Sequence, residues 1–344
     1  MKIIVTGGLG FVGSAVIREL IRNTDFQIIC LDAMTYSASP LAVEECYESW
    51  RYSFVKADIR HPDILAEVFE NWQPDAVLHL AAETHVDRSI DAPDTFIGTN
   101  LVGTFNLLQT ARNHWNGRTG CFRFHHVSTD EVFGSLERNV PRFTEVSPYR
   151  PNSPYSATKA GSDHLVHAWG HTYGLPVVIS ACSNNYGPWQ HPEKFIPSLI
   201  TAAIDGRNMA VYGDGKNIRD WLYVEDHARA ISALLVEGKI GETYVIGAES
   251  ELANIQVARM VCRLFDEIHP ECSPHEKLIE FVKDRPGHDF RYGIDPAKVC
   301  DEIGWRPETS FEAGLSRTIE WYIDHESWWR ERKSESRQQI APSI

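Results

Sequence analysis

The chain has 344 residues, of which 43% are hydrophobic, so it is long enough and apolar enough to bury a sizeable core. Its formal net charge of −14 excludes a general role at nucleic acids or membrane surfaces, because both need a broad basic field. No window approaches the roughly 18 to 20 apolar residues of a membrane span and no signal-like start is present, so we expect a soluble, cytoplasmic protein.

The seven cysteines are odd in number and widely spaced. None forms a Cys-x-x-Cys pair, so the sequence indicates neither a disulfide framework nor a zinc site. We therefore expect reduced thiols and no bound metal.

The first 23 residues predict a short apolar strand, a glycine turn and a helix with one apolar face. Further strands are predicted at 26–32, 52–58, 76–82, 122–128 and 177–183, and helices at about 62–72, 99–115, 155–173 and 193–205. Strand alternating with helix indicates an α/β fold with a parallel, doubly wound Rossmann-type sheet.

The character of the chain changes after about residue 183, where Gly, Pro, Asn and aromatic residues become frequent and strands become sparse. We expect residues 1–182 to form a dinucleotide-binding domain, to which the chain returns at about 220–250. Residues 183–330 are expected to form mainly a smaller, mixed substrate-binding domain. Residues 331–344 are polar and poor in apolar side chains, which predicts a frayed tail.

The stretch "VTGGLGFVG" carries a dinucleotide-binding pattern, at Gly8, Gly10 and Gly13 and also at Gly7, Gly10 and Gly13. Such glycines let the backbone turn tightly and approach a pyrophosphate, whose charge then lies at the N-terminus of the next helix. Alone, the pattern also fits a plain glycine-rich turn. Its place between a strand and a helix, and Asp32 at the end of the second strand, favour a nucleotide site.

Asp32 also indicates which dinucleotide binds. A carboxylate at this strand end can bind both ribose hydroxyls of the adenosine and would repel a 2′-phosphate, so we expect NAD rather than NADP. Asp58 and Ile59, after the third strand, could flank the adenine, although an Asp at a strand end can equally cap the next helix. The remaining residues expected at the cofactor are Phe11, Val12 and Ala81.

The stretch "YSATK" places Tyr155 and Lys159 four residues apart, and therefore on one face of a helix. There the ammonium can lower the pKa of the phenol and hold the nicotinamide ribose, while the phenol takes the proton of a secondary alcohol. An isolated Tyr-x-x-x-Lys often occurs by chance. After a nucleotide motif and a strand ending in "VST", it indicates hydride-transfer chemistry.

Asp130 and Glu131 are adjacent carboxylates directly after the strand predicted at 122–128. At a strand end the chain leaves its pleat, so neighbouring side chains can reach one ligand. Two like charges in a partly dry cleft cannot both ionise cheaply, so at least one of the two groups keeps a proton. Such a pair can supply an acid and a base for an elimination, although two acids here can also simply cap the following turn.

Seven stretches carry a family resemblance: "GGLGFVGS", "AAETHVDRSI", "STDEVFG", "YSATKA", "SNNYGPWQHPEKFIP", "IRDWLYVEDHARA" and "DRPGHDFRYGID". With them the chain resembles the extended short-chain dehydrogenases/reductases, and among these the dTDP-glucose 4,6-dehydratases, from about residue 1 to 325. Thr84 and Phe133 stand where that family usually has Ser and Tyr. Ala181 stands where a polar residue is usual, which could remove a contact near the sugar.

The resemblance implies a lyase that dehydrates dTDP-glucose to dTDP-4-keto-6-deoxyglucose, with one NAD reduced and reoxidised in each turnover. Oxidation at C4 makes the C5 proton acidic, water leaves across C5 and C6, and hydride returns to C6. The resemblance makes Glu131 the base at C5 and Asp130 the acid for the leaving C6 hydroxyl. It makes Thr129 the hydroxyl that polarises the C4 oxygen.

The substrate's pyrophosphate needs cations that the net charge does not provide. Arg219, Lys194 and Arg285 lie in segments that look like substrate loops, where each could otherwise form a surface salt bridge. With the resemblance, Arg219 and Arg285 become the expected phosphate ligands, since guanidinium binds phosphate through two parallel hydrogen bonds.

The resemblance also implies contacts to the rest of the nucleotide sugar. Asn185, Asn254 and His288 match family positions that contact the nucleotide sugar, and Tyr212 could stack on the base. The glucose hydroxyls are expected to meet Thr84, His85 and Asp87, with loop capping as the alternative for Asp87.

Other functions stay open on the sequence. The closest are a 4,6-dehydratase acting on UDP-glucose or another nucleotide sugar, and a nucleotide-sugar C4 epimerase or decarboxylase. The Asp130 and Glu131 pair weighs against an epimerase, which does not expel water. A different class is a non-catalytic NAD-sensing protein, which would leave Tyr155 and Lys159 idle. The family also implies a homodimer, joined through the helices near 100–115 and 155–170.

Overall fold

The computed structural model describes residues 1–116 and 121–340. Its centre is a seven-stranded sheet in the order β10-β6-β5-β4-β1-β2-β3, in which every neighbouring pair is parallel. This is the strand order of a Rossmann fold, so the predicted doubly wound α/β sheet is confirmed. The strands are β1 Lys2–Thr6, β2 Gln27–Asp32, β3 Tyr52–Lys56, β4 Ala76–His79, β5 Arg123–Thr129, β6 Val177–Cys182 and β10 Thr243–Ile246.

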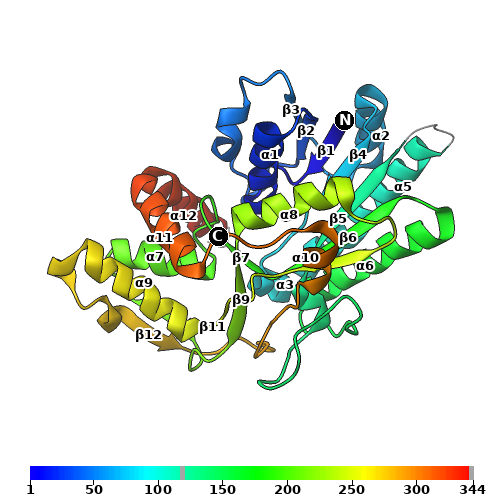
Figure 1. The fold of residues 1–344 in the computed structure, drawn as a ribbon. Helices are drawn as coiled ribbons and strands as arrows, with labels where there is room; N and C mark the ends of the chain where they lie inside the picture. The colour runs from blue at the N-terminus through cyan, green and yellow to red at the C-terminus, as the bar shows by residue number, and fades with distance from the viewer. Residues whose placement is uncertain (117–120, 341–344) are drawn as a thin grey trace.

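Helices cover both faces of this sheet, because its strands present apolar side chains to both (Figure 1). Ile3 and Val5 of β1 point into one core, and Ile4 between them points into the other. The first core is covered by α1 Phe11–Asn23 and α8 Val224–Glu237. The second is covered by α2 Pro62–Trp72, α5 Thr104–Trp115 and α6 Pro154–Tyr173.

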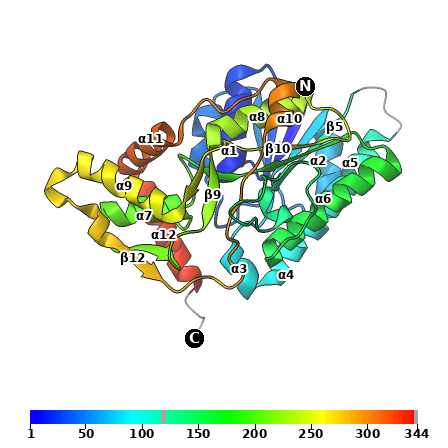
Figure 2. The ribbon, with the colours of Figure 1, turned by 60° about the horizontal axis from the view of Figure 1, so that its bottom comes forward.

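A second lobe, with its own apolar core, is built from the chain after residue 183. Figure 2 shows α9, α7 and β12 grouped on one side of the molecule, away from α5 and α6. β7, β9 and β11 form one small sheet, and β8 pairs with β12. The elements are β7 Asn184–Tyr186, α7 Phe195–Ile204, β8 Met209–Tyr212, β9 Ile218–Tyr223, β11 Glu251–Ala253, α9 Asn254–Ile268, β12 Ile279–Val282, α11 Phe311–Asp324 and α12 Glu326–Ile340.

The expectation of sparse strands after residue 183 is wrong, since β7 to β12 all lie there. They have three to six residues each, which is too short for an alternating pattern to be detected in the sequence. One of them, β10, extends the large sheet beside β6, and the preceding α8 packs on α1. The chain thus crosses between the lobes more than once, and the boundary at residue 183 stays a prediction.

Short helical turns link these elements. The helix predicted at 99–115 is α5, preceded by the π-helical segment η2 (Ile97–Gly103). The other turns are η1 Pro40–Cys46, α3 Val86–Asp91, α4 Pro93–Phe96, η3 Asp130–Phe133, η4 Pro270–Cys272, η5 His275–Leu278 and α10 Ala297–Ile303. Within residues 1–116 and 121–340, no helix has the length and apolar character that crossing a membrane requires.

The polar end of the chain differs from the prediction of a frayed tail. Residues 331–340 continue α12, and residues 341–344 lie outside the described residues. Two tryptophans at the start of α12 hold it in place. Trp328 is buried and its Nε1 donates to Ser39 Oγ at 3.0 Å, while Trp329 Nε1 donates to the carbonyl of Tyr322 at 2.9 Å. Burial of these two rings offsets the polar composition that follows.

Candidate active site

A pocket lies at the carboxyl ends of β1, β2, β4 and β5, where ligands bind in doubly wound folds. Its far wall comes from the loop that leads from β6 to α7, so both lobes line it. The predicted residues that line this pocket are Gly7, Gly10, Phe11, Val12, Gly13, Asp32, Asp58, Ile59, Ala81, Thr84, Thr129, Asp130, Glu131, Tyr155, Lys159, Asn185 and Lys194.

The glycine turn after β1 tolerates no side chain at two positions. Gly7 has φ +68°, and a Cβ there would lie 2.8 Å from the backbone of Ala81. A Cβ at Gly13, in the first turn of α1, would lie 2.1 Å from the Gly7 carbonyl oxygen. The turn therefore packs its backbone directly against the first turn of α1. A backbone without side chains at the N-terminus of a helix suits an anionic group such as a pyrophosphate.

Asp32, at the end of β2, is buried beside this turn. Its Oδ2 accepts the Leu9 amide at 3.0 Å and its Oδ1 accepts the Met34 amide at 2.7 Å. Burial raises the pKa of Asp32, while the two amide hydrogen bonds oppose the rise. Each oxygen keeps a lone pair for a ribose hydroxyl, and a 2′-phosphate would meet a buried carboxylate.

Asp58 does not cap the next helix, α2, whose N-cap is His61, and its expected place beside the adenine stays a prediction. It lines the pocket with Ile59, and its Oδ1 also accepts the backbone amide of Arg60 at 2.9 Å. The Arg60 guanidinium pairs with its Oδ2 at 2.7 Å. The carboxylate is therefore held in the turn by Arg60.

Four side chains that the sequence did not single out join the two lobes across the pocket, and we name them the clasp: Tyr36, Arg88, His191 and Glu193. The Arg88 guanidinium lies 3.7 Å from the centre of the Tyr36 ring and binds Glu193 Oε2 at 3.1 Å. The His191 ring meets the Tyr36 ring edge-on at 5.5 Å. Tyr36, His191 and Glu193 all line the pocket.

Tyr155 and Lys159 share one face of α6, whose start is fixed by Pro154 and a capping box between Ser153 and Ser156. Lys159 Nζ donates to the Val127 carbonyl at 2.8 Å. Both side chains are buried at the floor of the pocket.

The expected lowering of the Tyr155 pKa is wrong in this arrangement. Burial raises the pKa well above its ordinary value, and the charge of Glu131 adds to the rise, while a hydrogen bond with Thr129 opposes it. The spacing of four residues places Lys159 on the right face but does not fix where its ammonium points. Here the ammonium is directed at Val127 on β5.

Asp130 and Glu131 lie in η3, directly after β5, in surroundings that separate their pKa values. Asp130 is 1% exposed and its Oδ2 has no partner, so burial raises its pKa well above the usual range, and Glu131 adds to this. Burial also raises the pKa of Glu131, but the cations of Arg219 and Lys194 oppose the rise. Asp130 therefore keeps its proton at higher pH than Glu131 does.

The predicted phosphate ligands already have partners in the protein. Arg219 Nη2 donates to the carbonyl of Asp289 at 2.9 Å, and Lys194 Nζ donates to the carbonyl of Thr84 at 3.1 Å. Arg285 forms an ion pair with Asp87, with Nε to Oδ1 at 2.5 Å. Arg285 and Asp87, which were both predicted to contact the substrate, thus bind one another.

Seven predicted substrate residues lie outside the pocket lining: His85, Asp87, Tyr212, Arg219, Asn254, Arg285 and His288. Three of them gather in the second lobe, where the Tyr212 ring lies 6.2 Å from the His288 ring and 5.3 Å from the Arg285 guanidinium. Asn254 begins α9, and His85 caps α3 by accepting the Arg88 amide at 3.4 Å.

Asn185 lines the pocket, but its amide is bound by the protein. Its Oδ1 lies 2.9 Å from His227 Nδ1, and its Nδ2 donates to the carbonyl of Ser183 at 3.0 Å. Ala181 is fully buried in an apolar cluster with Phe133, so packing, rather than a sugar contact, accounts for its lack of a polar group.

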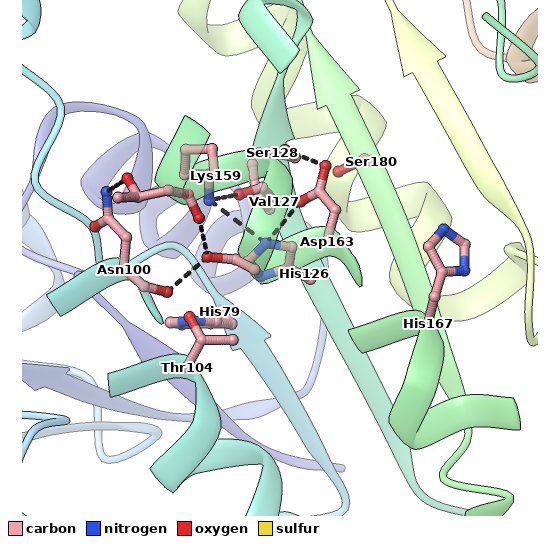
Figure 3. A network of polar contacts seen from close by, with 12 residues as sticks. His79, Asn100, Thr104, His126, Val127, Ser128, Lys159, Asp163, His167 and Ser180 are labelled. Carbon is pink, nitrogen blue, oxygen red and sulfur yellow. Dashed lines mark hydrogen bonds and ion pairs between the residues drawn. The ribbon is translucent and has the colours of Figure 1, made fainter. Parts of the chain in front are cut away.

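A buried polar network behind Lys159 was also missed (Figure 3). His126 and Ser128 of β5 meet Asp163 of α6, with His126 Nε2 at 3.1 Å from Oδ1 and Ser128 Oγ at 2.8 Å from Oδ2. His126 Nε2 lies 3.5 Å from Lys159 Nζ. The signal that could have found Asp163 is its spacing of four residues from Lys159, the same as from Lys159 back to Tyr155.

Cysteine and metal chemistry find no support among residues 1–116 and 121–340. All seven cysteines are free, and burial raises the pKa of Cys182, which lines the pocket, to about 12. No group of three His, Cys, Asp or Glu side chains in these ranges is placed to hold a metal ion.

Comparison with known proteins gives a consistent match. The family model described as GDP-mannose 4,6 dehydratase matches residues 4–318. A dTDP-glucose 4,6-dehydratase from Neisseria meningitidis is 52% identical over 337 residues, which cover 96% of this chain and 95% of that protein.

Two solved structures share the fold along almost the whole chain. DesIV, a dTDP-glucose 4,6-dehydratase from Streptomyces venezuelae with NAD bound, has a TM-score of 0.90 at 41% identity, covering 96% of this chain and 100% of that chain. The dTDP-glucose 4,6-dehydratase from Bacillus anthracis in complex with NAD has a TM-score of 0.87 at 39% identity, over 96% and 99%.

The matched range includes the glycine turn, the clasp and the cluster around Tyr212, so the pocket lies wholly inside the likeness. The resemblance carried by the seven sequence motifs is confirmed. The chain belongs to the GDP-mannose 4,6-dehydratase family and, within it, to the dTDP-glucose 4,6-dehydratases.

Proposed function

We propose that the chain is an NAD-dependent hydro-lyase that converts dTDP-glucose to dTDP-4-keto-6-deoxyglucose. The observation that carries the proposal is the pair Asp130 and Glu131, whose surroundings hold their pKa values apart beside Tyr155 in one pocket. Oxidation at C4 needs only the tyrosine and a dinucleotide. Loss of water needs in addition an acid and a base, and this pair supplies both.

The cofactor site suits NAD. The glycine turn at the N-terminus of α1 takes the pyrophosphate, Asp32 binds the adenosine ribose hydroxyls, and Lys159 holds the nicotinamide ribose. When bound, NAD supplies the acceptor for the hydride of C4 and its donor to C6. NAD is also present in the two solved relatives.

The proton steps follow from the positions of four side chains and from the pKa directions of Asp130 and Glu131. Tyr155 is neutral without the cofactor, so it would take the proton of the C4 hydroxyl once the positive charges of the bound nicotinamide and of Lys159 favour its phenolate, while Thr129 donates a hydrogen bond to the C4 oxygen. The ketone makes the C5 proton acidic, and ionised Glu131 takes it. Asp130 gives its proton to the C6 oxygen, which leaves as water. Glu131 then returns a proton to C5, and the proton gained by Tyr155 balances the one lost by Asp130.

The nucleotide is placed in the second lobe. Arg285 exchanges Asp87 for a phosphate oxygen, and Arg219 adds a second cation. Tyr212 stacks on the base beside His288, with Asn254 at the start of α9. The sugar then points to Thr84 and His85, while Asn185 shapes the pocket wall through its bond to His227.

Two other functions fit the site less well. A C4 epimerase would have no use for a protonated Asp130 beside an ionisable Glu131, since it expels no water. A non-catalytic NAD-binding protein would have no need for either acid, and burying them costs free energy that an apolar pair would avoid.

We expect turnover of dTDP-glucose in preference to UDP-glucose. The two substrates carry the same sugar, so a preference reports on the nucleotide contacts alone. Both are compared at equal concentration by the alkaline absorbance of the 4-keto-6-deoxy product. Product from neither would overturn the proposed dehydration, and product mainly from UDP-glucose would keep the reaction but change its substrate.

We expect Asp130→Asn and Glu131→Gln to separate oxidation from dehydration. Both variants should still reduce bound nicotinamide with substrate, while water loss slows by about 10² to 10⁴-fold, the usual weight of general acid–base catalysis. Tyr155→Phe should instead slow the reduction itself by a similar factor. The measurement follows nicotinamide absorbance and product with substrate deuterated at C4. Water loss at the wild-type rate in both amide variants would show that the two acids only cap the following turn.

We expect Glu193→Gln to release NAD faster. The amide keeps the shape of the side chain but removes the charge that holds Arg88 over Tyr36. A loss of about 1 kcal/mol, typical of a partly exposed ion pair, corresponds to a roughly fivefold faster release. The release rate is measured by dilution of the loaded protein, with the exposed Glu48→Gln as the matched control. Equal rates in all three proteins would show that the clasp does not retain the cofactor.

We propose that the chain forms a homodimer through α5 and α6, which lie side by side in Figure 2. Ile97, Val102 and Phe105 are 48%, 47% and 43% exposed along η2 and α5, an apolar surface that a second copy would cover. Phe105→Glu should shift sedimentation from dimer to monomer. Val146→Glu, at a 91% exposed position outside these helices, is the control. A monomeric wild type would contradict the proposal.

A further inference from the structure

α6 presents three polar side chains on one face, each four residues after the last: Tyr155, Lys159 and Asp163. The first two belong to the active site proposed above. Asp163 is fully buried at the next turn and does not line the pocket. Figure 3 shows its carboxylate beside His126 and Ser128. A buried carboxylate is costly, so its partners indicate what it does.

Asp163 receives two hydrogen bonds, one from each of two other segments. Ser128 Oγ on β5 and Tyr149 OH before α6 donate to its Oδ2, at 2.8 and 2.9 Å. Its Oδ1 has no hydrogen-bond partner, and His126 Nε2 on β5 lies 3.1 Å from it. These contacts fix Asp163 relative to β5, the strand that carries Asp130 and Glu131.

His126 lies between Asp163 and Lys159. Its Nδ1 has no partner, while its Nε2 lies near both Asp163 and Lys159 Nζ. Burial lowers its pKa well below the ordinary value, so the ring is neutral and carries one N–H. A proton on Nε2 would face Asp163, and a proton on Nδ1 would leave Nε2 to accept from the Lys159 ammonium. In both tautomers the ring is a neutral group between the two charged side chains.

The other ionisable groups around Lys159 carry no compensating charge. Burial lowers the pKa of His79, whose ring packs on His126 at 5.1 Å, well below its ordinary value, so that it too is neutral. Burial raises the pKa of Cys182 on β6, to about 12, so it stays a thiol. Burial also favours the neutral forms of Tyr155 and His167, which lie on the same helix as Lys159.

We propose that Asp163 is a positioning residue for Lys159: it is held by Ser128 of β5 and by Tyr149, lies against His126, and supplies a counter-charge that keeps the Lys159 ammonium protonated and in place. Burial lowers the pKa of Lys159, and the charge of Asp163 is the largest influence that opposes this. The inference rests on the proposed function, in which Lys159 assists Tyr155 and holds the cofactor ribose.

The proposal predicts a change in titration with a definite sign. Without the Asp163 charge, Lys159 loses its proton at lower pH, by about 1 to 3 pH units for a close opposite charge. Nicotinamide reduction by substrate, which needs the ammonium, should then decline at correspondingly lower pH on the alkaline side. The acidic side of the profile should move little, because Lys159 is protonated there in either protein.

The test uses NAD-loaded Asp163→Asn, with Tyr149→Phe as the matched control. Tyr149→Phe removes one hydrogen bond from Asp163 but leaves its charge, so it should reduce thermal stability without moving the titration. Lysine labelled at Cε and observed by NMR gives the Lys159 titration directly, with the signal assigned by its loss in Lys159→Arg. This readout needs no substrate, so it stands whether or not the proposed dehydration is correct.

Single-turnover reduction of the bound nicotinamide across the same pH range then links the titration to the reaction. If Asp163→Asn does not fold, Asp163→Ser, which leaves room for a water, must show the same shift. A Lys159 titration that is unchanged in the folded variant would overturn the proposal. So would an equal shift in Tyr149→Phe, since it would assign the effect to packing rather than to charge.

Discussion

Removal of ionisable groups from water around the end of β5 is the constraint on which the site depends. Each charged form loses hydration when it is buried, so such groups can be placed here only in compensating sets. Lys159 is balanced by Asp163 and Glu131 faces the cations of the second lobe, whereas Asp130, whose Oδ2 has no hydrogen-bond partner, keeps its proton. The chemistry of the pocket is therefore a consequence of how unevenly its walls are charged.

β5 and α6 divide this work between them. β5 lies between two other strands and is covered on both faces, so each of its polar side chains needs an internal partner. His125 finds Ser180 on β6 at 2.8 Å, while Ser128 meets Asp163 on α6. The same strand then delivers the two acids at its end. Because α6 and β5 are fixed relative to each other, they set the distances between the oxidation residues on α6 and the elimination residues that follow β5.

The sequence predicts the parts of the site that lie within one strand, turn or helix. The glycine turn, Tyr155 with Lys159, and the adjacent acids are all of this kind, and each lines the pocket. The clasp could not be found in this way, because Arg88 and Glu193 are 105 residues apart and only the tertiary fold brings them together. The sequence also could not predict the direction of the Tyr155 pKa shift, because a spacing of four residues does not fix where the flexible Lys159 side chain points.

The path of the chain has a consequence for biosynthesis. The large sheet is completed by β10 and covered by α8, and the loop after β2 is held by Trp328 of α12 through Ser39. α8 and β10 follow β7, α7, β8 and β9 of the second lobe, and α12 follows all of its other elements. Although domains that lie early in a chain can fold while synthesis continues, this first lobe is completed only after part of the second has been made. Its nascent strands stay exposed until then, and truncation near the C-terminus would damage the nucleotide end of the molecule.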